Sequence, residues 1–164
     1  MTAIDKLLNK FKEIRDIKYQ IPLTRLDIDY CCSGKMKLFK KWLDDNNYIS
    51  RYRVCDFKWS DMNLPQKLFN IPHQNESTHV YLEIYINNQW IDTDPTWDIG
   101  LKNILPVNDW DGKTNCKIAV PVINKYSDSQ SEEIMNGIFD EQDAQANGDF
   151  YQAFNNYLKE NRIF

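Results

Sequence analysis

Apolar residues recur at helical spacing near both ends of the chain. In residues 3–17, apolar side chains return every three or four positions, with lysines and acidic residues between them. This spacing predicts an amphipathic helix that lies on the surface of the domain. A closing helix is expected over about residues 148–161, where four apolar side chains share one face: Phe150, Phe154, Tyr157 and Leu158.

A further helix is expected to begin at Cys31 or Cys32 and to end near Asn46-Asn47. The apolar positions of its buried stripe have helical spacing: Met36, Phe39 and Leu43, widened by Leu38 and Trp42. Four residues before Met36 lies Cys32, so this thiol shares the stripe at the start of the helix. Asp29 is a candidate cap for the same helix.

Alternating apolar residues predict an antiparallel hairpin in the middle of the chain. The apolar positions of its first strand alternate with polar and aromatic ones: Val80, Leu82, Ile84 and Ile86. Asn87-Asn88 can adopt the positive φ angles of a two-residue turn, and Gln89–Thr93 returns as the second strand. In this register Tyr81 faces Asp94, so that His79 lies diagonally beside Asp94 on one face of the sheet.

Two other stretches are expected to be strands. Tyr48–Phe57 precedes the hairpin, and Lys117–Ile123 follows it, with Pro121 favouring an edge position. Residues 126–133 are polar and are expected to be exposed. With 164 residues the chain fits a single domain, 1–164, whose core spans about residues 30–97.

Composition and charge narrow the function classes. A formal net charge of −4 disfavours general nucleic-acid binding. No run of about 18 apolar residues is present, so no membrane span is expected. Four cysteines, with charged residues throughout the N-terminal stretch, favour reduced thiols and a cytoplasmic protein. The sequence does not indicate an oligomeric state.

Cys32, His79 and Asp94 have complementary chemistry. A thiol at the start of a helix faces the positive end of the helix dipole, which favours the nucleophilic thiolate. A nearby histidine increases that preference and can protonate a departing amine. A carboxylate on the other ring nitrogen fixes the tautomer and the orientation of the ring. The three residues therefore predict a Cys-His-Asp triad, a chemistry that requires no cofactor and no metal.

Four short motifs, in order along the chain, resemble the transglutaminase-like superfamily. They are C-S-G-K at 32–35, Y-I-S-R-Y-R-V at 48–54, H-V-Y-L-E at 79–83 and W-I-D-T-D-P-T at 90–96. The resemblance implies an α+β, papain-like fold in which the cysteine-bearing helix packs against an antiparallel sheet. It also implies Cys32 as nucleophile, His79 as acid/base and Asp94 as the residue that orients it, while Lys35 has a structural role.

Several points stay open at this stage. The doubled cysteine leaves the register uncertain by one residue; Cys32 is preferred because its distance from Lys35 matches the superfamily. The companions of His79 on its face are large and include Tyr81, so either they are buried too or a bulge re-aims the ring. The first amide of the helix can donate to an oxyanion, and for the second donor Trp59 or a loop amide are candidates.

The same residues allow other interpretations. Cys31, Cys32, His79 and Asp94 could surround zinc, but adjacent cysteines seldom both ligate and no C-x-x-C spacing occurs. His73 is the only other histidine, so it is the alternative base. Cys55 is expected in the core and Cys116 in a loop or strand, without any motif around them.

The leading hypothesis is a transglutaminase-like cysteine hydrolase or acyltransferase. It would act on amide bonds of a protein, a peptide or a small conjugate through a thioester, and a bare single domain favours hydrolysis over cross-linking. Residues 58–77 and the tail after Asp98 are expected to wall its cleft. The alternative is a catalytically silent binding module in which Trp59, Trp97 and Trp110 form a recognition surface.

Overall fold

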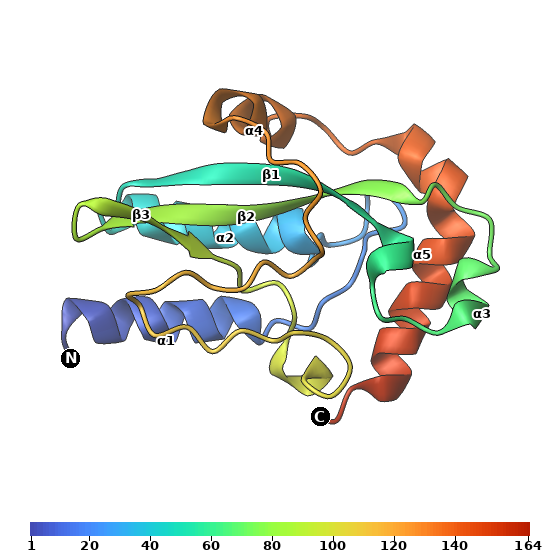
Figure 1. Ribbon diagram of the computed structural model, residues 1–164, viewed down its shortest axis with the longest axis horizontal. Coiled ribbons are helices and arrows are strands. Elements are labelled where there is room, and N and C mark those ends of the chain that lie inside the picture. The colour runs from blue at the N-terminus through green and yellow to red at the C-terminus, as the bar shows by residue number, and fades with distance from the viewer.

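Three antiparallel strands form the centre of the fold, in the order β1-β2-β3 (Figure 1). The computed structural model describes residues 1–164 and shows an α+β architecture in which five helices surround this sheet. The strands are β1 (Ser50–Lys58), β2 (Glu76–Ile86) and β3 (Gln89–Thr93). The helices are α1 (Ala3–Arg15), α2 (Cys32–Asp45), α3 (Gln66–Phe69), α4 (Asp128–Met135) and α5 (Glu141–Asn161). None of them is long and apolar enough to cross a membrane.

The hairpin of β2 and β3 has the predicted turn and register. Asn87 and Asn88 have φ angles of 51° and 64°, as a two-residue turn requires. Ile86 pairs with Gln89 and Leu82 pairs with Thr93, so the predicted second strand is confirmed at both ends. β1 begins two residues later and ends one residue later than predicted, and it pairs with β2 without a bulge.

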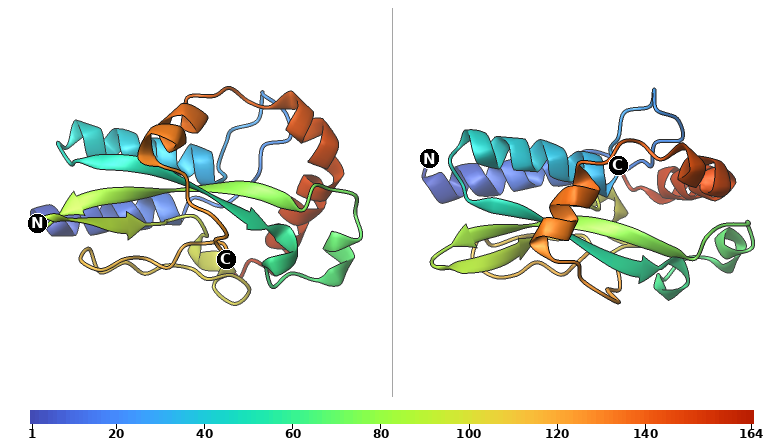
Figure 2. Two further views of the ribbon diagram at one scale, coloured as in Figure 1. Left: turned by 45° about the horizontal axis from the view of Figure 1, so that its top comes forward. Right: turned by 90° about the horizontal axis from the view of Figure 1, so that it is seen from above.

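Helices α1 and α2 cover one face of the sheet (Figure 2). The apolar face of α1 is buried there, and the stripe of α2 packs on alternate residues of β2, as the helical spacing predicts. Met36, Phe39 and Leu43 have no exposed surface. Leu38 is 45% exposed, so its assignment to the stripe is wrong. Successive residues turn by about 100° around a helix, so Leu38 lies outside the arc of Met36, Phe39 and Leu43, on the side that faces solvent.

Residues 117–123 are not a strand, and that prediction is wrong. The amide of Ala119 donates to the Asp94 carboxylate rather than to a strand, and Pro121 has no amide proton to donate. The chain reaches the sheet only afterwards, where residues 123–126 run along the free edge of β1. Ala119 and Val120 instead pack in a buried hydrophobic cluster together with Tyr81 of β2.

The C-terminal third contains more helix than its apolar spacing predicts. Helix α4 occupies most of the stretch predicted as exposed, and its Ser131 is fully buried, accepting a hydrogen bond from the amide of Val54 (2.9 Å). Helix α5 begins at Glu141, seven residues before the predicted start, because Asp140 caps a polar first turn. Helix α5 lies at the end of the sheet where β2 begins (Figure 1), and its aromatic residues Phe150, Tyr151 and Phe154 are buried in the core.

Candidate active site

The start of α2 is fixed by a network around Asp29. Cys31 is the N-cap residue, and its side chain does not cap the helix. The Asp29 carboxylate accepts hydrogen bonds from the Cys31 amide (2.9 Å) and the Ser33 hydroxyl (2.7 Å). Gly34 lies against Asp29, and a Cβ added there would be 1.8 Å from the Asp29 carbonyl oxygen. Asp29 therefore holds the helix start from outside, rather than serving as the predicted cap.

This arrangement makes Cys32 the first residue of α2. The first hydrogen bond within the helix runs from the Lys35 amide to the Cys31 carbonyl (3.0 Å), so the amides of the preceding residues are not used inside the helix. The positive end of the helix dipole consequently lies at the Cys32 sulfur.

The second part of the site is the predicted pair of His79 and Asp94. His79 lies on the part of β2 that extends beyond the end of β3, and Asp94 follows directly after β3. His79 Nε2 and Asp94 Oδ2 are 2.8 Å apart, and both side chains are buried. The structure therefore brings them together through the diagonal relation that the hairpin register predicts.

The large companions of His79 are buried, and no bulge is needed to aim the ring. Tyr81 has no exposed surface and Glu83 is 7% exposed, while Tyr85 at the far end of the strand is open to solvent. Glu83 is buried because Arg51 and Arg53 on the neighbouring strand pair with its carboxylate. Both faces of β2 are thus covered near His79.

The Asp94 carboxylate is saturated with hydrogen bonds. Besides the ring of His79, it accepts bonds from the Thr96 hydroxyl and from the Ala119 amide (2.7 Å). Its backbone carbonyl accepts a bond from the Asn108 amide group (2.8 Å). These partners fix both the position of the carboxylate and the direction in which it presents an oxygen to His79.

The surroundings of Cys32 favour the thiolate. A hydrogen bond from the Cys31 thiol lowers the pKa of Cys32 most; burial opposes this, and the ring of His79 and the amide of Val80 lower it further. The pKa of Cys32 consequently lies well below that of a free thiol. The pKa of Cys31 is raised, first by its hydrogen bond to Cys32 and then by burial.

His79 is held in its charged form. Burial lowers the pKa of the ring, but the charge and hydrogen bond of Asp94, followed by those of Cys32, outweigh it and raise the pKa to about 10. Because Nε2 is bonded to Asp94, the other ring nitrogen is the one left for the sulfur. The arrangement is therefore a thiolate beside an imidazolium, which suits attack on a carbonyl followed by proton delivery to a leaving group.

Lys35 is buried and bonded to the loop that follows Asp94, so it has the structural place that the sequence predicts. Its Nζ donates to three backbone carbonyls: Arg15 (2.7 Å), Ile17 (2.9 Å) and Thr96 (2.7 Å). Three bonds use every proton of an ammonium group. Burial lowers the pKa of Lys35 to about 7, while the charges of Asp98 and Asp94 act against that. Lys35 thus ties α1 and α2 to the loop that follows Asp94.

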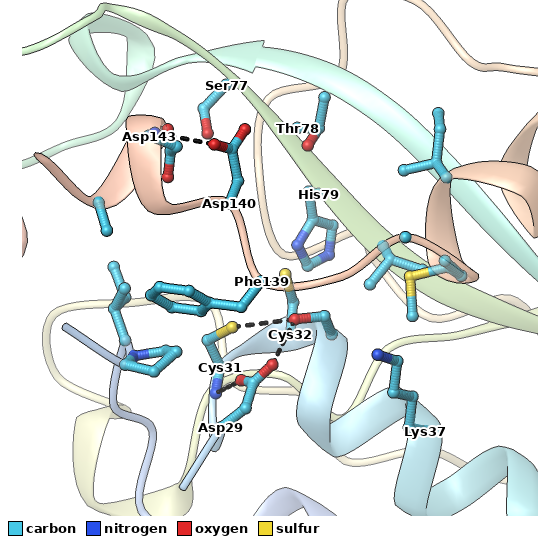
Figure 3. A pocket seen from close by; sticks show the side chains of 18 of the residues that line it. Asp29, Cys31, Cys32, Lys37, Ser77, Thr78, His79, Phe139, Asp140 and Asp143 are labelled. Carbon is cyan, nitrogen blue, oxygen red and sulfur yellow. Dashed lines mark hydrogen bonds between the residues drawn. The ribbon is translucent and has the colours of Figure 1, made fainter. Parts of the chain in front are cut away.

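Cys32 and His79 open into a cleft with a volume of about 650 Å³ (Figure 3). One wall is the segment from Tyr19 to Asp29, and the other runs from Ile134 to Ala144 between α4 and α5. Figure 3 shows Phe139 beside Cys31, with Asp140 and Asp143 beyond it. The prediction that the tail forms a wall is confirmed, whereas residues 58–76 do not line the cleft.

Other residues considered from the sequence lie away from the cleft. His73 stacks on Phe150 with ring centroids 4.1 Å apart, and its Nδ1 contacts the Ile71 carbonyl (2.6 Å). Cys55 is fully buried, and Cys116 is half-buried in a loop. No group of three or more histidine, cysteine or acidic side chains is placed to hold a metal ion.

The three tryptophans proposed as a recognition surface are buried instead. Trp59, Trp97 and Trp110 are 5%, 3% and 5% exposed, so that part of the binding-module hypothesis is wrong. Trp59 packs against Phe150 and Phe154 with ring centroids 5.1 and 5.2 Å apart, and it does not line the cleft. It is therefore also excluded as the second oxyanion donor.

Sequence reasoning missed the partners that lie far along the chain. Ala119 and Asn108 support Asp94 from a segment without periodic spacing, and no local signal points to them. Tyr19 lines the cleft because the bridge between Gln20 and Tyr30 brings its segment beside the start of α2. The aromatic and apolar residues that alternate with polar ones before Pro22 are the only local feature of the sequence that indicates a wall of the cleft.

No protein-family model, curated protein or solved structure matches the chain.

Proposed function

We propose that the protein is a cysteine hydrolase or acyltransferase of the transglutaminase-like kind, built on a papain-like core. The observation that carries the proposal is the convergence of Cys32, His79 and Asp94: the thiol and the ring line one open cleft, and the buried carboxylate bonds to the ring. Each arrives there from a different element, with the thiol at a helix start and the ring and carboxylate on adjoining parts of a hairpin. The order of the motifs along the chain supports the same assignment.

The reaction follows from the charges in the cleft. The Cys32 thiolate attacks the carbonyl carbon of an amide, a C–S bond forms, and the π pair moves to the oxygen. As the intermediate collapses, the C–N bond breaks and His79 gives its proton to the departing amine. A thioester remains on Cys32. Water or a second amine then attacks the thioester while neutral His79 accepts the proton, and the thiolate is regenerated.

Hydrolysis is the proposed outcome, and amide bonds of a protein, a peptide or a small conjugate are the proposed substrates. Residues 1–164 form one fold around one sheet, and the cleft beside Cys32 and His79 is where the acyl donor would bind. Water and an amine would attack the same thioester, so the products of the reaction distinguish the two acceptors.

The test uses p-nitrophenyl acetate as a small acyl donor. Release of p-nitrophenolate by the unmutated protein is expected, with an acetyl group found on Cys32 by mass spectrometry. Cys32→Ser should lower the rate at least about 10³-fold, because removal of a nucleophile disables the whole unit. Cys31→Ser is the matched control: it keeps a hydroxyl donor beside Cys32 in place of the thiol and should keep most of the rate. Acetate should remain the main product when methylamine is added.

Three results would count against the proposal. Equal rates in Cys32→Ser and the unmutated protein would show that Cys32 is not the nucleophile. Acetylation found mainly on Cys31 would show that the nucleophile is Cys31 and not Cys32. N-methylacetamide as the main product would leave the thioester chemistry in place but replace hydrolysis with acyl transfer.

A further inference from the structure

Tyr19 lines the cleft with a hydroxyl that has no partner in the protein. Its side chain is 7% exposed, and the hydrogen bonds of this residue are made by the backbone: the amide donates to the Asp98 carboxylate (3.0 Å) and the carbonyl accepts from Arg162 (3.2 Å). A tyrosine that is more than nine-tenths buried normally finds a partner for its hydroxyl. The cleft is where such a partner would bind.

The ring of Tyr19 is held firmly in place. It packs on Trp97 with ring centroids 4.6 Å apart and on Phe154 at 6.4 Å. The bridge between Gln20 and Tyr30 fixes the segment beside the start of α2. A donor on a fixed ring costs little reorganisation when charge develops near it, which is the requirement for stabilising a transition state.

Tyr19 lines the same cleft as Cys32. Burial raises the pKa of Tyr19 well above its ordinary value, and the neighbouring Cys31, Cys32 and Asp29 raise it further. The phenol therefore stays protonated throughout the neutral range and can donate its proton in a hydrogen bond. Tyr151, the other buried tyrosine of the cleft, differs because its hydroxyl already donates to Asp143 (2.9 Å).

We infer that Tyr19 is a further catalytic residue, whose hydroxyl donates a hydrogen bond to the carbonyl oxygen of the substrate as that oxygen becomes negative. This inference rests on the proposed function. When the C–S bond forms at Cys32, the oxyanion accepts one bond from the Tyr19 hydroxyl and one from the Cys32 amide. Tyr19 keeps its proton, and both bonds weaken again when the carbonyl is restored. Tyr19 thus supplies the second donor that the helix start lacks.

The experiment compares two reactions of the same sulfur in Tyr19→Phe. Acylation by p-nitrophenyl acetate passes through an oxyanion, whereas alkylation by iodoacetamide displaces iodide at carbon and forms none. Tyr19→Phe keeps the ring that packs on Trp97 and removes only the hydroxyl. Its acylation rate is expected to fall by about 100-fold, the effect of removing one oxyanion donor. Its alkylation rate at Cys32 should change less than about twofold.

Tyr151→Phe is the control, since it removes a hydroxyl from the same cleft that is already bonded to Asp143. Its acylation rate should stay close to that of the unmutated protein. Alkylation of Cys32 also reports whether the site of each variant is folded.

Each other outcome decides the question. Unchanged acylation in Tyr19→Phe overturns the role of Tyr19 and leaves the proposed function standing. A parallel fall in acylation and alkylation shows that the hydroxyl only supports the structure, which also overturns the role. If the unmutated protein is neither acylated nor alkylated at Cys32, the proposed function fails, and the inference fails with it.

Discussion

The two sides of the His79 ring differ in how completely their polar groups are paired. Behind the ring, both carboxylate oxygens of Asp94 accept hydrogen bonds, and Lys35 uses all three of its donors on backbone carbonyls. In front of it, the amides at the start of α2 and the hydroxyl of Tyr19 lack partners in the protein.

The paired groups behind the ring hold the geometry of the site, and the unpaired donors in front of it are available to a substrate. A saturated, buried network holds its members in one geometry, because any loosened polar group would lose a bond that water cannot replace. Hydrogen-bond donors without a partner in the protein cost stability, but they are available to a ligand. A developing oxyanion is stabilised by such donors. The comparison predicts that changes behind the ring alter the geometry, the charge of the ring or the stability of the fold, and the reaction rate only through them, whereas changes in the cleft alter the rate directly.

The largest effect behind the ring is expected for Asp94→Asn. His79 and the Ala119 amide share Oδ2, so an amide nitrogen at that position would face both of them, whereas at the Oδ1 position it would face the Thr96 hydroxyl. In either case the ring would lose the charge that keeps it protonated. Acylation by p-nitrophenyl acetate should fall on the order of 10³-fold, as for a triad with the wrong tautomer.

Asp92→Asn provides the control for this prediction. It makes the same chemical change two residues earlier on β3, away from the ring, and should leave the acylation rate unchanged. Equal losses in the two variants would show that the carboxylate of Asp94 has no particular part in the reaction.

A smaller effect, on stability, is expected for Lys35→Met. The carbonyls of Arg15, Ile17 and Thr96 would lose their shared donor inside the protein. The free energy of unfolding should fall by about 2–3 kcal/mol, measured by urea denaturation. Lys37→Met is the control, because this exposed lysine makes no hydrogen bond within the protein, and its effect should stay within about 0.5 kcal/mol. Equal stabilities would contradict the supporting role of Lys35.

The hairpin and helix α2 could be predicted from the sequence because residues close together along the chain determine their structure. The asparagine turn sets the hairpin register, and that register places His79 beside Asp94. The helical stripe of α2 likewise places Cys32 at a helix start. Period, turn chemistry and pairing geometry are sufficient to place these features, whereas the choice of Cys32 over Cys31 as the candidate nucleophile also needed the resemblance to the superfamily.

The rest depends on contacts between distant segments. The backbone of residues 117–121 has no strand partner because its Ala119 amide is bonded to Asp94, and a polar stretch becomes α4 because Ser131 accepts from Val54. Tyr19 reaches the cleft through a single bridge. Such contacts leave no period in the sequence, and the walls of the cleft were accordingly the least predictable region.

The central claim is tested most directly by the pH dependence of alkylation with iodoacetamide, measured separately at each cysteine by mass spectrometry. Cys116 is an internal comparison, because burial raises its pKa to about 12. The thiolate is the reacting form, so the rate at each cysteine rises as the pH passes through its pKa. Cys32 should be alkylated with a midpoint well below the value of about 8.5 for a free thiol, while Cys116 reacts only in alkaline solution. A midpoint for Cys32 at or above that of a free thiol would contradict the thiolate–imidazolium pair and the enzyme built on it.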